Sequence, residues 1–153
     1  MSLKEEMMKI RAERETLSQK IRAMAGVVFA EEAKKLFEAN PKLESFSWTQ
    51  YTPYFNDGET CEFSANTDYI TVTDVDGNEE EEVSSWSVRH YSEKGTDWQG
   101  NPYTPSELEL AGVAACEFLA EFEDEDFLMM FGDHTRVTVF RDGRVESDDY
   151  DHD

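Results

Sequence analysis

The segment from Asp74 to Asn78 places carboxylate and amide oxygens at alternate positions, a spacing that could bind calcium. A calcium loop of the EF-hand type needs glycine at its sixth position, a bidentate glutamate at its twelfth, and a helix on each side. Counted from Asp74, those two positions hold Glu79 and Ser85, and no helical pattern flanks them. We therefore expect an Asp-Gly turn joining two strands here, and the sequence predicts no metal site and no cofactor.

The histidines, His90, His134 and His152, are scattered along the chain, and none is paired with serine or cysteine in a pattern for nucleophilic catalysis. Asp133 and His134 could form a general acid/base pair if a further carboxylate folded beside them. Such neighbours arise by chance in a chain this acidic. Phosphate-binding glycine-rich loops are absent. The sequence thus gives no catalytic residues and favours a non-enzymatic protein, with a ligand pocket or enzyme site built around aromatic residues and His90 as the weakest alternative.

The charge of the chain is very unevenly distributed. Residues 1–43 carry nine Lys/Arg against seven Glu, whereas residues 44–153 carry five Lys/Arg against twenty-eight Asp/Glu, which gives the whole chain a net charge of −21. An acidic surface of this size repels nucleic acid and anionic membranes and attracts basic partners. We therefore expect a basic protein surface as the partner, with no direct binding of nucleic acid or membrane.

Two acidic clusters are the candidate partner-binding sites. The first consists of Glu117, Glu121, Glu123, Asp124, Glu125 and Asp126, and the second of Glu79, Glu80, Glu81 and Glu82. Dense carboxylate on a rigid scaffold can imitate the phosphate backbone that Lys and Arg of DNA-binding proteins contact. The alternative, that the acid only keeps the protein soluble, is left open by the sequence.

An aromatic segment around Pro53 is the other candidate contact surface. It contains Trp48, Tyr51 and Tyr54. Alternate residues of a strand face opposite sides, so part of this set is expected in the core and part at the surface. Exposed Tyr and Trp are enriched at binding hot spots. The sequence leaves open whether these aromatic side chains bind a partner or fill the core.

The N-terminal segment has a heptad pattern. Apolar residues recur at alternating intervals of four and three, with Arg14 in one of the slots, at Leu3, Met7, Ile10, Leu17, Ile21, Met24 and Val28. This predicts a long amphipathic helix over residues 2–25, with Gly26 as a candidate kink, and a second helix over 27–39. The helix either packs on its own domain or pairs with a copy of itself or another helix.

The sequence of the remaining residues predicts strands, one helix with a clear start signal, and a hairpin. We expect strands at 45–55, 60–65, 69–73 and 84–91, with a turn at 56–59 and a loop at 74–82. Thr104, Pro105 and Glu107 have the pattern of a capped helix start, and a terminal hairpin should follow from residue 135. The predicted fold class is α+β, with a long N-terminal helix, an antiparallel sheet of about four to six strands built from hairpins, and one further well-capped helix.

The length predicts one domain. Its expected segments are a helical segment at 1–43, a β meander at 44–92, a helical segment at 104–131, a hairpin at 135–146 and an acidic tail at 147–153. With 39% apolar and 12% aromatic residues, the chain is too hydrophobic for a disordered acidic protein. Its two cysteines, Cys61 and Cys116, have no metal-ligand spacing and favour reduced thiols. No signal peptide or membrane span is indicated, so a soluble cytoplasmic protein is expected.

Residues 48–63 have the sequence WTQYTPYFNDGETCEF. This segment resembles a motif of small, mostly uncharacterised acidic proteins of tailed bacteriophages. The resemblance implies a phage-encoded protein acting in the cytoplasm of an infected bacterium, but no fold, activity or catalytic residue. The resemblance favours one expectation: that this acidic protein inhibits a host nucleic-acid-binding or defence protein by DNA mimicry. The alternative is a structural or assembly module that oligomerises, as a homodimer for example, through its N-terminal helix.

Overall fold

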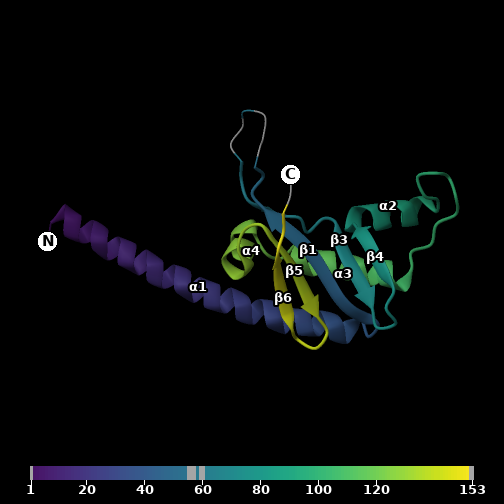
Figure 1. The fold of residues 1–153 in the computed structure, drawn as a ribbon, viewed down its shortest axis with the longest axis horizontal. Helices are drawn as coiled ribbons and strands as arrows, with labels where there is room; N and C mark the ends of the chain where they lie inside the picture. Colours follow the sequence, from purple (N-terminus) through teal and green to yellow (C-terminus); the bar gives the residue numbers. More distant parts are fainter. Residues whose placement is uncertain (1, 55–57, 59–60, 152–153) are drawn as a thin grey trace.

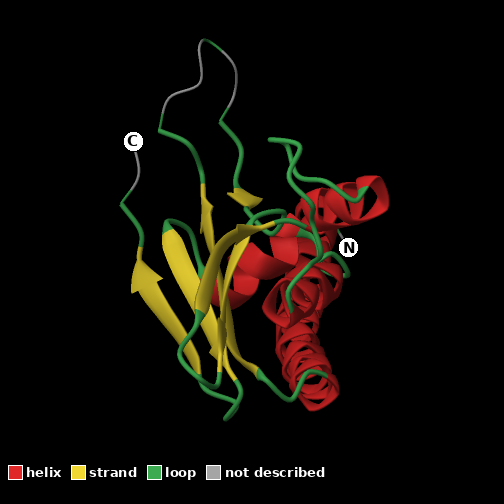
Figure 2. Ribbon diagram, turned by 90° about the vertical axis from the view of Figure 1, so that its right-hand side faces the viewer, coloured by secondary structure: helices red, strands yellow, loops and turns green. Residues whose placement is uncertain are grey.

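The computed structural model describes residues 2–54, 58 and 61–151, and it confirms the α+β class. The helices and strands form two layers, with the helices on one side of the sheet (Figure 1, Figure 2). The elements are α1 (Leu3–Ala39), β1 (Leu43–Tyr51), β2 (Ser64–Ala65), β3 (Ile70–Asp74), β4 (Glu79–Val83), α2 (Ser85–Lys94), α3 (Glu107–Leu119), α4 (Asp124–Phe131), β5 (Thr135–Phe140) and β6 (Val145–Asp149).

The sheet is antiparallel, and β1 is its central strand. The order is β4-β3-β1-β5-β6, while β2 pairs with the end of β1. The meander expected over residues 44–92 continues only as far as β4, because the segment expected as its last strand forms α2. After three helices, β5 returns to the other edge of β1. One face of the sheet packs on the helices and carries the core residues Phe46, Trp48 and Val137. A solvated second face is typical of antiparallel sheets.

Helix α1 is continuous over 37 residues, so the two helices expected at 2–25 and 27–39 are one, and Gly26 does not break it. One glycine costs a helix only about 1 kcal/mol, too little to break a segment with good helix formers on both sides. Only the C-terminal part of α1 is buried, through Phe29, Ala33, Leu36 and Phe37. Residues 3–28 project from the rest of the molecule as a rod roughly 39 Å long (Figure 1).

The projecting rod carries the apolar heptad positions in solvent. We call this set the exposed stripe, and it consists of Leu3, Met7, Ile10, Leu17, Ile21, Met24 and Val28. The expectation that the whole helix packs on its own domain is therefore wrong for residues 3–28. We call the remaining part, from Phe29 onward, the body. Within the described residues, no helix has the length and apolar content needed to cross a membrane.

Two predicted hairpins are present with changed bounds. β5 and β6 form the terminal hairpin, and β6 continues to Asp149, inside the segment expected to be an acidic tail. β1 and β2 pair antiparallel as the first hairpin requires, although β2 is only two residues long. Most of the turn expected at 56–59, together with Phe55, lies outside the described residues. The strand expected at 69–73 is confirmed as β3.

The prediction for residues 74–91 is wrong in two places. Residues 84–91, expected to be a strand, form α2, because the Ser84 hydroxyl accepts a hydrogen bond from the Ser87 amide and Gly95 ends the helix in the left-handed region. The expected loop contains β4, whose glutamates pair with β3 at the sheet edge. Edge strands tolerate charge, which also discourages pairing between molecules.

The predicted capped helix is confirmed, but it begins later than expected. Ser106, not Thr104, is the N-cap: its hydroxyl accepts from the Glu109 amide while the Glu109 carboxylate accepts from the Ser106 amide. The buried face of α3 includes Ala111, Ala115, Phe118 and Leu119, as its apolar spacing predicts. The short apolar segment that follows is α4, which ends at Gly132.

Candidate functional site

The exposed stripe ends where the body begins, at two adjacent residues of α1. Val28 is 45% exposed, whereas Phe29 is 3% exposed. The Phe29 ring lies 5.1 to 6.2 Å, between centroids, from the rings of four body residues, Trp48, Phe118, Phe122 and Phe131. This aromatic cluster anchors the base of α1 to the body and leaves the rest of the helix unsupported.

The exposed stripe and the face of α1 that packs on the body point in different directions, roughly 120° apart. Successive residues of an α-helix are rotated by about 100°. By that rotation, the buried residues Phe29, Ala33, Leu36 and Phe37 point away from the direction of the stripe. Beyond Val28 the stripe positions are taken by Glu31 and Lys35, which are exposed. The stripe is thus accessible along its whole length, with no part of the body over it.

Two groups of acidic residues lie at the two edges of the sheet. Glu79, Glu80, Glu81 and Glu82 of β4 are exposed at one edge, and all five residues of β6 are exposed at the other. The second acidic candidate cluster is therefore solvent-accessible. The sequence analysis did not include the acids of β6, because it assigned Asp148 and Asp149 to a tail.

The first acidic cluster is divided between surface and structural positions. Glu117 forms an ion pair with Arg89. The Asp124 carboxylate accepts from the Ala65 amide at 3.0 Å, and the Asp126 carboxylate accepts from the Glu123 amide at 2.9 Å at the start of α4. Glu121 and Glu125 are exposed. Two of the six residues of this predicted binding cluster, Asp124 and Asp126, thus hold the start of α4 and its contact with β2, and Glu117 links α3 to α2.

Trp48 and Tyr51 differ in burial as strand alternation predicts, and Tyr54 lies beyond the end of β1. Trp48 is 2% exposed and lies in the core, so it is not available as a partner contact. Tyr51 is half-buried, with its ring centroid 5.6 Å from that of Tyr150. Tyr54 is exposed and stacks on His134 at 4.9 Å between centroids. Only Tyr54 has the exposure that the hot-spot hypothesis needs.

Gln50 is a buried polar residue that the sequence analysis missed. Its amide oxygen accepts from Trp48 Nε1 at 2.9 Å, and its Nε2 donates to the carbonyls of Phe127 and Gly132 at 2.9 and 2.7 Å. These bonds tie β1 to the middle of α4 and to its C-terminal cap. A signal was present, because Gln50 follows Phe46 and Trp48 at inward-facing positions of one strand. Its role is structural, since all these partners lie within the fold.

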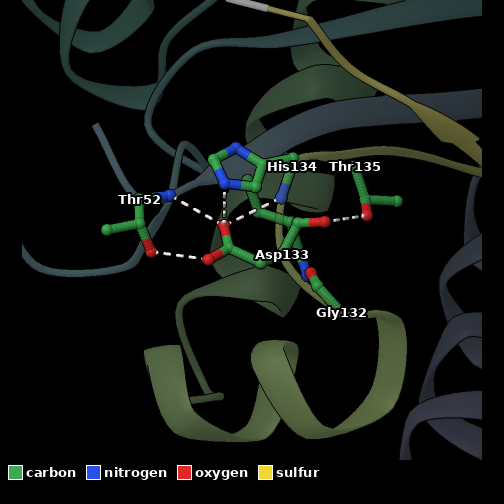
Figure 3. Close-up of polar contacts among 6 residues, drawn as sticks. Thr52, Gly132, Asp133, His134 and Thr135 are labelled. Atoms are coloured by element: carbon green, nitrogen blue, oxygen red, sulfur yellow. Dashed lines mark hydrogen bonds and ion pairs between the residues drawn. The ribbon is translucent and has the colours of Figure 1, made fainter. Parts of the chain in front are cut away.

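The Asp133 carboxylate organises the chain between α4 and β5 (Figure 3). It accepts hydrogen bonds from the Thr52 amide at 2.8 Å, the Thr52 hydroxyl at 2.7 Å and the His134 amide at 2.8 Å. Burial favours a higher pKa for Asp133, but these hydrogen bonds outweigh it and hold the pKa below its ordinary value. His134 Nε2 lies 3.7 Å from Asp133 Oδ1.

This arrangement supports a structural role for Asp133 rather than general acid/base chemistry. The acid/base hypothesis required a further carboxylate beside the pair, and the group in that place is the Thr52 hydroxyl. His134 has a φ of 52°, which the hydrogen bond from its own amide to Asp133 helps to hold. Asp133 therefore fixes β1 to the start of β5.

The Asp74 loop has the structure of a tight turn. Asp74 Oδ1 accepts from the amides of Asp76 and Asn78, and Gly77 has a φ of 89°. The pKa of Asp74 is lowered, first by its hydrogen bonds with the side chain and the amide of Asn78. The predicted Asp-Gly turn between two strands is confirmed. Over the described part of the chain, no three His, Cys, Asp or Glu side chains are grouped so that they could hold a metal ion.

A cleft beside α2 is the place where a ligand pocket could exist. Its volume is about 500 Å³, and Tyr69, Trp86, Arg89 and Cys116 are among its lining residues. Burial raises the pKa of the Cys116 thiol to about 11, which disfavours the reactive thiolate. His90 stacks on the exposed Trp86 ring, 4.8 Å between centroids. Nothing in this cleft arranges a nucleophile against a base.

Comparison with known proteins gives no relative for this chain, because no protein-family model, no curated protein and no solved structure matches it.

Proposed function

We propose that this protein is a non-enzymatic assembly module whose N-terminal helix is the assembly element. The observation that carries the proposal is the exposed stripe, seven large apolar side chains along one face of a projecting helix. Extended apolar surface in water marks an interaction site, because its burial is the main driving force of association. Its length, nearly four heptads, is sufficient for coiled-coil pairing.

The stability of the rod itself gives a second argument. Helix formation in water is only marginally favourable without tertiary contacts, and most helical stability in proteins comes from packing an apolar face. Residues 3–28 have such a face, but none of them is buried against the body. A partner helix on the stripe supplies the missing packing. The long rod is then a functional element rather than an accessory of the fold.

A second function, docking on a basic protein surface, is favoured by the position of the acid. Glu79 to Glu82 and the residues of β6 present carboxylates at both sheet edges, on a body whose residues 44–153 carry a net charge of −23. We include in this candidate the inhibition of a host nucleic-acid-binding or defence protein by DNA mimicry in an infected bacterium. Assembly and docking are compatible, because the stripe and the acidic edges are separate surfaces.

The assembly proposal is tested by light scattering on three forms of the full chain. The variant Leu17→Glu/Ile21→Glu places two charges in the stripe, and the control Ala12→Glu/Gln19→Glu places two on the opposite side of the rod. We expect the unmodified chain and the control to have a mass above the 17.6 kDa of one chain, and the stripe variant to be monomeric. Equal masses for all three forms would refute the proposal.

The docking candidate is tested by capture from a bacterial lysate, with and without excess duplex DNA. Capture of a basic nucleic-acid-binding protein that DNA displaces, and that is lost when Glu79 to Glu82 are changed to Lys, would support mimicry. A captured set that neither DNA nor the Lys variant alters would exclude it. Electrostatic docking also requires the capture to weaken as salt is raised.

A further inference from the structure

We infer that two copies of the chain pair through α1 in antiparallel orientation, so that the tip of each rod lies at the base of the other. This inference rests on the proposed function and specifies the partner and its direction. The occupant of the exposed stripe is then a second copy of the same stripe. The two acidic bodies lie at opposite ends of a shared pair of helices.

The side chains that meet in this orientation are well matched. With the stripes fully overlapped, Leu3 faces Val28 of the second copy and Met7 faces Met24. Ile10 then faces Ile21, and Arg14 faces Leu17. All stripe residues are exposed in the single chain and available for this contact. The overlap ends at Val28, where the stripe itself ends, and the face of α1 that packs on the body is turned roughly 120° away from the stripe.

Arg14 distinguishes the two directions of pairing. In a parallel pair, each stripe residue faces its own copy, so two Arg14 guanidinium groups meet within the apolar seam. Like charges facing each other there are destabilising, because both must be desolvated without a counter-charge. In the antiparallel pair, each Arg14 lies opposite Leu17 of the second copy, so the two guanidinium groups are in neighbouring layers and each extends along the helix surface to water. Arg14, which interrupts the stripe, thus disfavours the parallel arrangement, in which both guanidinium groups share one layer.

The flanking charges permit both directions. The antiparallel pair brings Glu13 beside Lys20 of the second copy, and the parallel pair would bring Glu6 beside Arg11. Exposed ion pairs of this kind contribute only about 0.2–1 kcal/mol each. They do not decide the orientation, but neither do they oppose the antiparallel one.

The charge of the bodies gives the larger electrostatic difference. Residues 44–153 carry a net charge of −23, and a parallel pair would hold two such bodies side by side at Phe29. The antiparallel pair separates them by about the length of the rod, roughly 39 Å. That distance is several times the Debye length of about 8 Å at physiological salt, so repulsion is screened. It also brings the tip of the rod, where residues 3–11 carry three Lys/Arg against two Glu, towards the acidic body of the second copy.

Cysteine cross-linking of the full chain tests the direction. Met7→Cys and Met24→Cys are made separately in a Cys61→Ser background, because Cys61 is half-buried while Cys116 is buried. A disulfide requires Cα atoms within about 7 Å. Antiparallel pairing predicts that each variant alone gives no linked dimer, whereas an equimolar mixture, after exchange and mild oxidation, gives the mixed disulfide. Peptide mass spectrometry identifies which residues are joined.

The other outcomes overturn the inference in distinguishable ways. If each variant forms a disulfide with its own copy, the pairing is parallel, and the assembly proposal survives without the antiparallel direction. If no disulfide forms although light scattering gives a dimer, the copies do not meet through the exposed stripe. If the reduced variants and the unmodified chain are monomeric, both the inference and the assembly proposal fail.

Discussion

Val28 and Phe29 are neighbours in one helix, yet the first is 45% exposed and the second 3% exposed. Between them lies the boundary between a free apolar stripe and a folded core. The same helix therefore has two different tasks. Its base completes the core of the body, and its projecting part presents a surface that the body does not use.

Removing the Phe29 ring should destabilise the body, whereas shortening Val28 should not. Phe29→Ala leaves a cavity among four aromatic rings and should cost roughly 3–5 kcal/mol. Val28→Ala, measured in dilute solution, should change the free energy of unfolding by less than about 0.5 kcal/mol. Urea unfolding followed by tryptophan fluorescence measures both. Equal losses for the two variants would contradict the boundary.

Alanine should have opposite effects at two helical glycines. A Cβ on Gly112 of α3 would lie 2.5 Å from Val83 Cγ1, whereas a Cβ on Gly26 of α1 would meet nothing within 4 Å. Gly112→Ala should therefore destabilise the body by roughly 1–3 kcal/mol despite its better helix propensity. Gly26→Ala should stabilise the rod by up to about 1 kcal/mol. Urea unfolding measures the stability of the Gly112→Ala protein, and circular dichroism measures the helix content of the Gly26→Ala protein. A stabilised Gly112→Ala protein would show that α3 packs less closely on β4.

Replacing Gln50 by leucine should be costly although the volume is similar. The variant leaves the carbonyls of Phe127 and Gly132 and the Trp48 indole N–H without their partner. Each buried group left unpaired costs roughly 1–3 kcal/mol. Gln99→Leu, at an exposed position, is the matched control and should leave the urea midpoint almost unchanged. Similar midpoints for both variants would mean that water replaces the Gln50 bonds.

The contribution of Asp133 to stability should depend on pH. Its pKa is lower in the folded chain than its ordinary value, so its hydrogen bonds stabilise the fold at neutral pH and this stabilisation is lost as pH falls through the folded-state pKa. Asp133→Asn removes the titrating group. We expect the variant to be less stable than the unmodified protein at pH 7, with a difference that shrinks below about pH 4. Urea unfolding across this range checks it; a difference independent of pH would contradict the role of the carboxylate.

The sequence predicts the class of the fold and most of its elements, because periodicity depends on local residues. The heptad of α1, the apolar face of α3 and the terminal hairpin all follow from spacing. Prediction from the sequence fails where tertiary pairing overrides the local secondary-structure propensity. The glutamates of β4 form a strand only because β3 pairs with them, and Ser84 starts a helix in a segment whose alternation resembles a strand.

The candidate surfaces were predictable in part. The spacing from Leu3 to Val28 defines a stripe, but whether the body covers it depends on where the chain folds back, which no local pattern records. Trp48 and Tyr54 have similar chemistry and opposite environments, because Trp48 is at an inward-facing position of β1 whereas Tyr54 lies beyond the end of that strand. Asp124 and Asp126 belong to an acidic run, yet their carboxylates cap backbone amides at a corner that only the assembled fold creates.

Sedimentation equilibrium of the unmodified chain over a range of concentrations tests self-association through α1 most directly. We predict an apparent mass that rises with concentration towards twice the 17.6 kDa of one chain, because burial of the exposed stripe drives pairing. A mass that stays at 17.6 kDa at every concentration would contradict the account.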